Sequence, residues 1–363
     1  MSPQPNPTGS PSRRTAPIDS LTSLRGLAAL WVVLVHCNDV LGLLFPHVQR
    51  LAPAFDAGVM MVSVFFVLSG YVLGLRYREE FRTLGTRAYL RFQALRLGRI
   101  YPVHAVTLLA AVFIFAHNGW PTDEAHSVGN LVANVFLVQS WQWSHRLSWN
   151  FPAWSLSSEW FAYLLLPFLL RTVVDLPRRA SVAGTFLCAL AAGLQAPFLN
   201  GLPFPRLLEL VPAFVGGVLM SRWIVPGEPS SRPARIADAC SLLLPVTPFV
   251  LAPGPGRTTV FLGLAFVLVG SLARAGASAS AFWRHPVVVW FGDISYPIYL
   301  VHMLSHGLFI RFVGFHRWID SSTPVKLLVV CAWAAGIVLS ATLLHHLVEV
   351  PCRRWSRRLL GAD

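Results

Sequence analysis

The first candidate for chemistry is a pair of ionisable side chains in the apolar segment SLRGLAALWVVLVHCN, which begins at Ser23. Arg25 and His36 are eleven residues apart, so on a helix they project from the same face. About 16.5 Å of helix rise separates them at 1.5 Å per residue. Arg25 alone also fits a basic anchor at a membrane surface, and His36 alone fits a hydrogen-bonded structural histidine. Their shared face favours one polar path that leads inward from Arg25 to His36.

A second pair of cationic residues stands in the segment LRLGRIYP, where Arg96 and Arg99 share a helix face three residues apart. Planar guanidinium groups bind phosphate through paired hydrogen bonds, so this face suits a phosphate-rich ligand. A basic cluster at a membrane surface has the same pattern. The segment VFFVLSGYVLG adds the hydroxyl of Ser69, and its neighbour Gly70 permits close helix packing.

A carboxylate stands on an otherwise apolar segment, NFPAWSLSSEWFAYLLLP, which contains Trp154, Ser155 and Glu159. Five tryptophans crowd this region between positions 141 and 160. They fit an aromatic belt at a membrane surface, and rings at an outward-facing mouth would also stack on a sugar. Glu159 is not explained by a belt, and it is either a catalytic carboxylate or a partner for a buried cation.

The last candidate segment, FGDISYPIYLVHMLSH, contains Ser295, Tyr296, Tyr299, His302 and His306. The two histidines are four residues apart, but no H-E-x-x-H motif or third ligand accompanies them, so we expect no metal site. The chain also lacks a Walker A loop and the G-x-G-x-x-G and G-x-S-x-G motifs. ATPase, dinucleotide-binding and hydrolase functions therefore lose support.

The composition indicates which elements must position these residues. Hydrophobic residues make up 55% of the 363, charged residues make up 12%, and the mean hydropathy is +0.57. Soluble domains carry about 25% charged residues. The net charge of +13 comes from arginines that cluster between long apolar runs, which is typical of basic loops in a multi-span membrane protein and not of a nucleic-acid binder.

The apolar runs predict an all-α integral membrane protein with ten spans, since a span needs about 20 mostly apolar residues. A further segment, 128–141, is short and is expected to be re-entrant or to lie at the outer surface. The predicted spans are 22–44, 57–75, 100–117, 155–171, 180–199, 207–224, 236–252, 257–273, 286–310 and 325–348.

The distribution of basic residues predicts that both termini are cytoplasmic. With this orientation 22 of the 29 Lys and Arg residues lie on the cytoplasmic side. The basic stretch 76–98 is expected to include an amphipathic helix on the inner face. We predict a disordered tail over residues 1–20, a membrane domain over 21–352 and a short basic tail over 353–363.

Five short motifs fall in order on the predicted spans. They are Arg25 with His36; Phe65, Phe66, Ser69 and Gly70; Arg96, Arg99, Ile100 and Pro102; Trp154, Ser155, Leu156 and Glu159; and Gly292, Ser295, Tyr296, Tyr299, Leu300 and His302. Together they resemble the bacterial membrane acyltransferase family 3 of the OafA type, from about Leu21 to Arg354. The chain is expected to lack the C-terminal SGNH hydrolase-like domain of some relatives.

The resemblance implies transfer of an acyl group, commonly acetyl, from cytoplasmic acyl-CoA to a hydroxyl of a carbohydrate, a glycoconjugate or a glycosylated metabolite. Acyl-CoA is then a co-substrate, and no permanently bound cofactor is expected. In this interpretation His36 and Glu159 are catalytic. Arg25, Arg96, Arg99 and Ser69 bind acyl-CoA. The residues that bind or support the acceptor are Trp154, Ser155, Ser295, Tyr296, Tyr299 and His302.

Two mechanisms and two rival functions stay open at this point. His36 either acts as general base on the acceptor hydroxyl or attacks first and forms an acyl-imidazole. Glu159 either orients His36 or binds acceptor hydroxyls. The rivals are a transporter or flippase for a glycolipid or small anionic solute, and a non-catalytic membrane subunit. We expect a bacterial plasma (inner) membrane location with the lipid bilayer as partner and no nucleic acid; the sequence identifies no protein partner.

Overall fold

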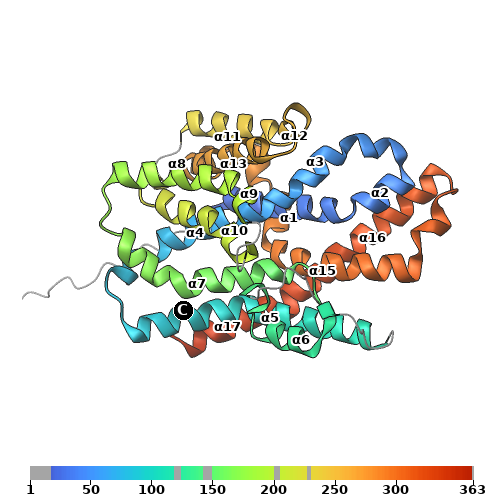
Figure 1. The fold of residues 1–363 in the computed structure, drawn as a ribbon, viewed down its shortest axis with the longest axis horizontal. Coiled ribbons are helices and arrows are strands. Elements are labelled where there is room, and N and C mark those ends of the chain that lie inside the picture. Colours follow the sequence, from blue (N-terminus) through green and yellow to red (C-terminus); the bar gives the residue numbers. More distant parts are fainter. Residues whose placement is uncertain (1–17, 118–123, 142–148, 200–204, 227–229, 362–363) are drawn as a thin grey trace, which may run out of the picture.

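The computed structural model of the chain describes residues 18–117, 124–141, 149–199, 205–226 and 230–361. Within these ranges the regular structure is helical and contains no strand (Figure 1). This confirms the expected all-α fold, in which each helix satisfies its own backbone hydrogen bonds inside a bilayer. Residues 1–17 of the predicted tail and Trp143 lie outside the described residues.

The first predicted span is a helix that breaks near its end. α1 (Asp19–His36) and α2 (Asn38–Leu44) meet at a bend of 60°. Polar side chains at the bend have partners in other segments: Asn38 Nδ2 donates to Asp56 Oδ1 at 3.2 Å, and Asp39 Oδ1 lies 3.4 Å from His306 Nε2. The break therefore places His36 in the last turn of α1, beside other polar groups.

The second predicted span, 57–75, corresponds to the short helix η2 (Ala57–Met60) and to α4 (Met61–Tyr77). Two further short helices, η1 (Pro46–Leu51) and α3 (Ala52–Asp56), precede it. A turn containing η3 (Glu80–Arg82) then leads into α5.

α5 (Thr86–His117) is one helix of 32 residues. The sequence predicted an amphipathic surface helix within 76–98 and a separate span from residue 100. The structure joins the two, because Pro102 is accommodated inside the helix. Arg96 and Arg99 consequently lie in the middle of a long helix and not at the start of a span.

The remaining described α-helices follow in chain order. They are α6 (Val128–Val135), α7 (Ala153–Val173), α8 (Arg178–Leu194), α9 (Ala196–Leu199), α10 (Pro205–Met220), α11 (Ser231–Leu243), α12 (Thr247–Val250), α13 (Pro255–Ala275), α14 (Pro286–Asp293), α15 (Ser295–Leu308), α16 (Thr323–Leu344) and α17 (Val350–Leu359). Two π-helical turns, η8 (Phe309–Val313) and η10 (His345–Glu349), continue α15 and join α16 to α17.

Several helices are long and apolar enough to cross a bilayer. Four segments in the described residues meet this criterion, and two bent helix pairs raise the number to six. Helices lie in all ten predicted spans, but four of these spans are each divided between two α-helices: 22–44, 180–199, 236–252 and 286–310. Ten crossings remain a prediction. The four segments are Pro46–Tyr77, Thr86–His117, Pro255–Ser278 and Thr323–Leu359, and the bent pairs are α1 with α2 and α14 with α15 through η8.

The segment 128–141 contains no helix that could cross a bilayer. α6 has 8 residues, which at 1.5 Å per residue is about 12 Å against about 30 Å of hydrocarbon. His104 of α5 holds this segment in place, because its Nε2 lies 2.8 Å from the carbonyl oxygen of Asn134. Both members of this contact are buried.

Connections that carry arginines gather at one end of the bundle. The α4–α5 and α7–α8 connections lie at the same end as the C-terminal helix α17 (Figure 1). Arg91 of α5 holds the chain end there, because its guanidinium donates to the carbonyl oxygens of Leu360 and Gly361 at 3.1 and 2.8 Å. This grouping agrees with the predicted basic face.

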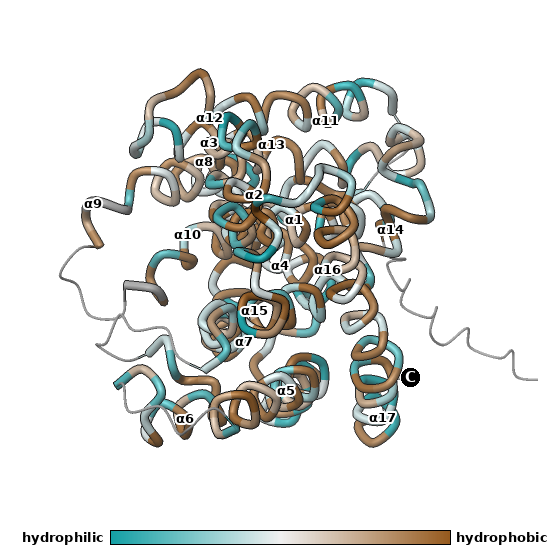
Figure 2. Tube along the Cα trace, turned by 90° about the vertical axis from the view of Figure 1, so that its right-hand side faces the viewer, coloured by the Kyte–Doolittle hydropathy of each residue, from teal (hydrophilic) through white to brown (hydrophobic). Residues whose placement is uncertain are grey.

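The centre of the bundle contains α1 and α4, which the end-on view of Figure 2 shows inside a ring of other helices. α4 crosses α10 closely at two glycines. A Cβ built on Gly217 would lie 2.2 Å from the carbonyl oxygen of Val67, and one on Gly70 would lie 2.1 Å from that of Phe214. Small residues allow this backbone approach in membrane bundles. The predicted packing role of Gly70 is thus confirmed.

We expect Gly217→Ala to destabilise the fold by about 1–3 kcal/mol, because the added methyl meets backbone that cannot rotate away. The measurement is the thermal unfolding temperature of the purified protein in detergent. Gly336→Ala is the matched control, since nothing lies within 4 Å of a Cβ at that helical position. Equal unfolding temperatures for the two variants would show that α4 and α10 do not depend on this crossing.

Candidate active site

Arg25 faces a break between two helices. α14 ends at Asp293 and α15 begins at Ser295, with a bend of 67° between them. The guanidinium of Arg25 donates to the carbonyl oxygen of Gly292 at 2.9 Å, and the Ser295 hydroxyl donates to the same oxygen at 2.7 Å. Arg25 thus neutralises the negative end of α14. The sequence predicted a continuous span over 286–310, and this break corrects it.

A tight helix contact holds Arg25 at that break. A Cβ built on Gly26 would lie 2.6 Å from the amide nitrogen of Gly292, and one on Gly292 would lie 2.0 Å from the carbonyl oxygen of Thr22. Only glycines permit α1 and α14 to approach this closely. The glycine next to Arg25 therefore sets the distance from its guanidinium to the helix break.

Arg99 of α5 is the centre of a charged cluster. Arg25 also interacts electrostatically with Arg99. Arg99 interacts electrostatically with Glu349, which is 2% exposed in the π-helical turn η10. Glu349 also lies 2.9 Å from Nδ1 of His345. The other partners of Arg99 are Tyr163, Glu159 and Tyr296.

Glu159 belongs to this arginine cluster. Its Oε1 accepts a hydrogen bond from the hydroxyl of Tyr163, one helical turn further along α7. The Ser69 hydroxyl of α4 donates to the same oxygen at 3.5 Å. The sequence placed Glu159 at an aromatic outer mouth, with a possible role in orienting His36. The structure instead pairs Glu159 with Ser69 and Tyr163, and within the described residues no contact joins Glu159 to His36.

Arg96 lies in an aromatic cage. Its guanidinium carbon is 5.7 Å from the ring centroids of both Tyr77 and Phe92 and 6.0 Å from that of Tyr163. One terminal nitrogen donates to the Tyr77 hydroxyl at 3.3 Å. The Nε atom is buried without a hydrogen-bond partner in the described part of the chain. Arg96 and Arg99 share a face as predicted, but aromatic rings cover much of Arg96.

His36 meets a second histidine across the bundle. Its Nδ1 lies 2.9 Å from the carbonyl oxygen of Val32 and 3.3 Å from Nε2 of His302 in α15. Because a carbonyl oxygen only accepts, Nδ1 of neutral His36 carries the proton. Its Nε2 then has the free lone pair that a general base or nucleophile needs. The ring of Phe151 lies edge-on to His36 at 5.4 Å and covers one side.

Polar side chains connect the arginine cluster to the two histidines. Ser155 lies one turn before Glu159 on α7, and its hydroxyl is 2.7 Å from the hydroxyl of Tyr299. The Tyr299 ring lies 5.9 Å from the ring of His302, which in turn contacts His36. Ser155, Tyr299 and His302 thus form a chain of contacts that ends at His36. A continuous polar path from Arg25 to His36 stays a prediction.

Two predicted acceptor residues have structural contacts. Trp154 is 8% exposed and belongs to the main hydrophobic core, so its ring packs inside and does not line an open mouth. The Tyr296 hydroxyl donates to the carbonyl oxygen of Ile100 on α5. These positions support the helices that carry the site.

Sequence reasoning missed two contributors. Tyr77 contacts Arg96, and Phe151 covers His36. The sequence does indicate Tyr163, which follows the motif of Trp154 and Glu159 by four residues. The segment HHLVEVPCRR contains Glu349, for which the sequence predicts a structural pairing with a nearby arginine. No local pattern indicates Tyr77 or Phe151, because both come from other segments.

The comparison with known families decides the class of protein. Residues 18–345 match the acyltransferase 3 family, described as an acyltransferase domain. The chain belongs to this family. It is therefore a membrane-embedded acyltransferase, and the transporter and non-catalytic alternatives lose their support.

Three relatives show how far the similarity of this acyltransferase extends. Acyltransferase MdmB of Streptomyces mycarofaciens is 31% identical over 94% of the chain and 93% of its own length. Peptidoglycan O-acetyltransferase OatA of Listeria monocytogenes is 25% identical over 94% of the chain and 56% of its own length. A putative O-acetyltransferase of Staphylococcus aureus strain COL is 22% identical over 93% of the chain and 57% of its own length. No solved structure matches the acyltransferase.

Proposed function

We propose that this acyltransferase moves an acyl group, with acetyl as the first candidate, from cytoplasmic acyl-CoA to a hydroxyl of a carbohydrate, glycoconjugate or glycosylated metabolite. It would act in the bacterial plasma membrane. The observation that carries the proposal is two groups of polar side chains inside apolar helices. Arg25, Arg99 and Glu159 form the first group. Ser155, Tyr299, His302 and His36 form the second.

The proposed acceptor class has support from the relatives. The Listeria relative is named as a peptidoglycan O-acetyltransferase, and peptidoglycan is a glycan polymer. The similarity extends over 94% of this chain. Because that protein is 25% identical, the acceptor of this chain is proposed only as a class.

The proposed donor site uses the arginines. Guanidinium groups suit the phosphates of CoA. Arg25 keeps further donor atoms beyond its bond to Gly292, and Arg96 has a buried Nε without a partner among the described residues. Glu159 and Glu349 neutralise part of the charge near Arg99. We therefore assign two roles to Arg99, which orders the charged cluster and also binds acyl-CoA. We assign acyl-CoA binding to Ser69 as well.

The proposed chemistry is general-base transfer at His36. Its Nε2 takes the proton of the acceptor hydroxyl while that oxygen attacks the thioester carbonyl. The carbon–sulfur bond then breaks, and the CoA thiolate leaves with the proton that the imidazolium returns. The alternative is attack by His36 Nε2 itself, which forms an acyl-imidazole and releases CoA thiol before the acceptor hydroxyl takes the acyl group.

Thiol release by the purified protein tests the proposal and separates the two schemes. Acetyl-CoA is supplied with and without a mixture of glycans and glycosides, and free thiol and base-labile acyl ester are both counted. We expect one ester for each thiol in the presence of the acceptor. A burst of thiol without acceptor would indicate the acyl-imidazole. Absence of thiol release across acetyl-, propionyl- and butyryl-CoA with every acceptor would contradict the proposal.

His302 is expected to support His36 during the reaction. Its Nε2 accepts from His36 Nδ1, and a hydrogen bond to a charged group is worth about 1.5–3 kcal/mol. We therefore expect His302→Ala to lower the transfer rate by roughly 10- to 100-fold, at 1.36 kcal/mol for each factor of ten. The measurement is the initial rate at saturating acyl-CoA.

The conservative variant separates this role from packing. In His302→Gln the side-chain oxygen is able to accept from Nδ1 of His36, so part of the rate should return. His47→Gln, at an exposed position, is the control and should keep the wild-type rate. A wild-type rate in His302→Ala would remove His302 from the site.

A further inference from the structure

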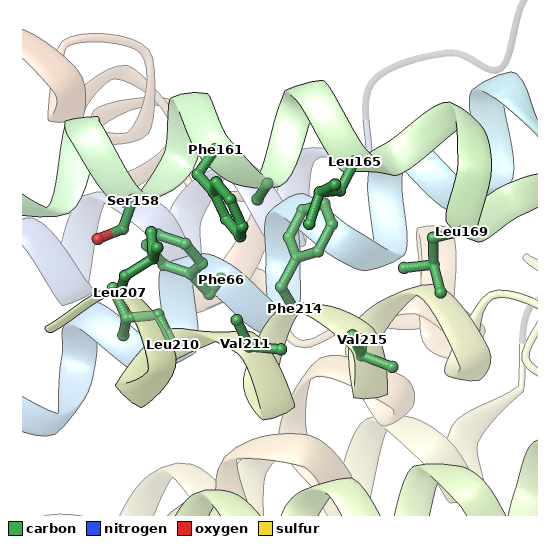
Figure 3. Close-up of a pocket in the computed structure, with 11 residues that line it drawn as sticks. Phe66, Ser158, Phe161, Leu165, Leu169, Leu207, Leu210, Val211, Phe214 and Val215 are labelled. Atoms are coloured by element: carbon green, nitrogen blue, oxygen red, sulfur yellow. The ribbon is translucent and has the colours of Figure 1, made fainter. Parts of the chain in front are cut away.

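A cavity lies outside the polar path, between three helices. α7 and α10 run side by side along it, and Phe66 of α4 closes its floor (Figure 3). Its volume is about 120 Å³. Side chains from successive turns of α7 and α10 point into it, among them Phe161, Leu165, Leu169, Leu210 and Val215.

The wall of this cavity is hydrocarbon. Ser158 is the one polar residue among those that line it in the described structure. The Ser158 hydroxyl already donates to the carbonyl oxygen of Trp154 at 3.3 Å. A buried water typically needs two or more polar partners, and this wall does not offer them. The occupant that the wall fits is therefore apolar.

The cavity opens at the surface of the helix bundle. Leu165 and Val211 line it, and their exposed fractions are 46% and 36%. Both helices correspond to predicted spans, and in that arrangement the medium beside these side chains is lipid. The lining residues of α7 run from Ser158 to Leu169, about 16.5 Å of helix rise. An elongated hydrocarbon chain fits this length.

The position of the cavity indicates which lipid it meets. Leu169 lies near the end of α7 that leads into the α7–α8 connection, where Arg171, Arg178 and Arg179 are exposed. These cations suit the phosphate of an anionic head group. We propose that the cavity between α4, α7 and α10 binds one acyl chain of an anionic glycerophospholipid from the leaflet next to the basic loops.

This lipid site does not depend on acyl transfer, but it lies behind the catalytic helix. Ser158 and Phe161 face the cavity from α7, and the neighbouring Glu159 faces the arginine cluster. A bound chain would fill the space behind α7 with van der Waals contacts. Loss of the bound acyl chain should lower the stability of the protein. It should lower the rate of acyl transfer only if α7 changes its position.

Native mass spectrometry of the protein purified in mild detergent tests the site. The probe is phosphatidylglycerol added back to delipidated protein. We expect Val211→Phe, which fills the cavity from its rim, to bind at least tenfold less tightly than wild type at the strongest site. Val267→Phe, at a position of α13 with a 45% exposed side chain, is the matched control and should bind like wild type. Val215→Leu replaces Val211→Phe if the larger side chain prevents folding.

Photolabelling locates the bound chain without a variant. Phosphatidylglycerol with a diazirine in its acyl chain should label peptides that contain Phe161–Leu169 and Leu207–Val215 at substoichiometric lipid. Equal binding by wild type and Val211→Phe, or label spread over all lipid-facing helices, would overturn the site. Retention of an isoprenoid in place of a glycerophospholipid would overturn the proposed occupant.

Discussion

Replacement of His36 by alanine is expected to lower acyl transfer by about 100- to 10,000-fold, the range typical of a lost general base. His36 is the histidine at which the chain of contacts through Ser155, Tyr299 and His302 ends. Its Nδ1 is held by Val32 and His302, so Nε2 faces the reaction. The measurement is the initial rate of acyl ester formation at matched protein concentration.

The His36→Ala protein should still fold. His36 is only partly buried and lies at the end of α1, so truncation removes few packed contacts. Its unfolding temperature should stay close to that of wild type. A variant with normal stability and an undiminished rate would exclude both the general-base and the acyl-imidazole schemes.

Arg99→Gln is expected to lower stability and activity together. The substitution removes a cation that interacts electrostatically with Glu159 and Glu349, while His345 stays 2.9 Å from Glu349. Loss of a buried cation lowers stability, because part of the carboxylate charge then stays uncompensated. We expect a clear fall in unfolding temperature and a raised KM for acyl-CoA. Arg50→Gln, at an exposed position, is the control.

A double substitution separates the two effects of Arg99. Arg99→Gln with Glu349→Gln removes two opposite charges that interact electrostatically, and it should recover part of the lost stability. Transfer should stay low, because the double variant still lacks the donor-binding cation. If the double variant is no more stable than Arg99→Gln, the partnership with Glu349 is wrong. If its KM is normal, Arg99 does not bind the donor.

The sequence predicted the parts of the fold that depend on local patterns. Apolar runs of about 20 residues mark helices in any bilayer, and helices lie in all ten predicted spans, although four of these spans are each divided between two α-helices. The eleven-residue spacing of Arg25 and His36 also defined a path on one face of α1. The confirmed expectations are the all-α membrane fold and the acyltransferase family, which rest on composition and on ordered motifs.

The sequence did not predict where helices break or merge. The bend at Ile294 depends on Arg25 and Ser295, which both bond the exposed carbonyl of Gly292. The bend after His36 depends on contacts from Asp56 and His306. α5 stays continuous through Pro102 because its neighbours hold both halves. Each of these outcomes is set by side chains that lie far away in the chain.

The sequence also did not predict which side chains contact one another within the site. Glu159 was expected beside aromatic residues at an outer mouth, because Trp154 and Glu159 are close in sequence. The packing of α7 against α4 and α5 instead turns Glu159 toward Ser69 and Arg99. The cage around Arg96 brings together Tyr77 and Tyr163 from two further helices. Such contacts follow from tertiary packing and leave no local pattern.

The most direct test of the account is transfer of radiolabelled acetyl from acetyl-CoA in membranes that contain this chain, with host glycan and lipid fractions as acceptors. Wild type and His47→Ala should place base-labile label in a glycan or glycolipid fraction. His36→Ala at the same protein level should lose that label. Equal label in wild type and His36→Ala would contradict the claim that His36 is the centre of acyl transfer.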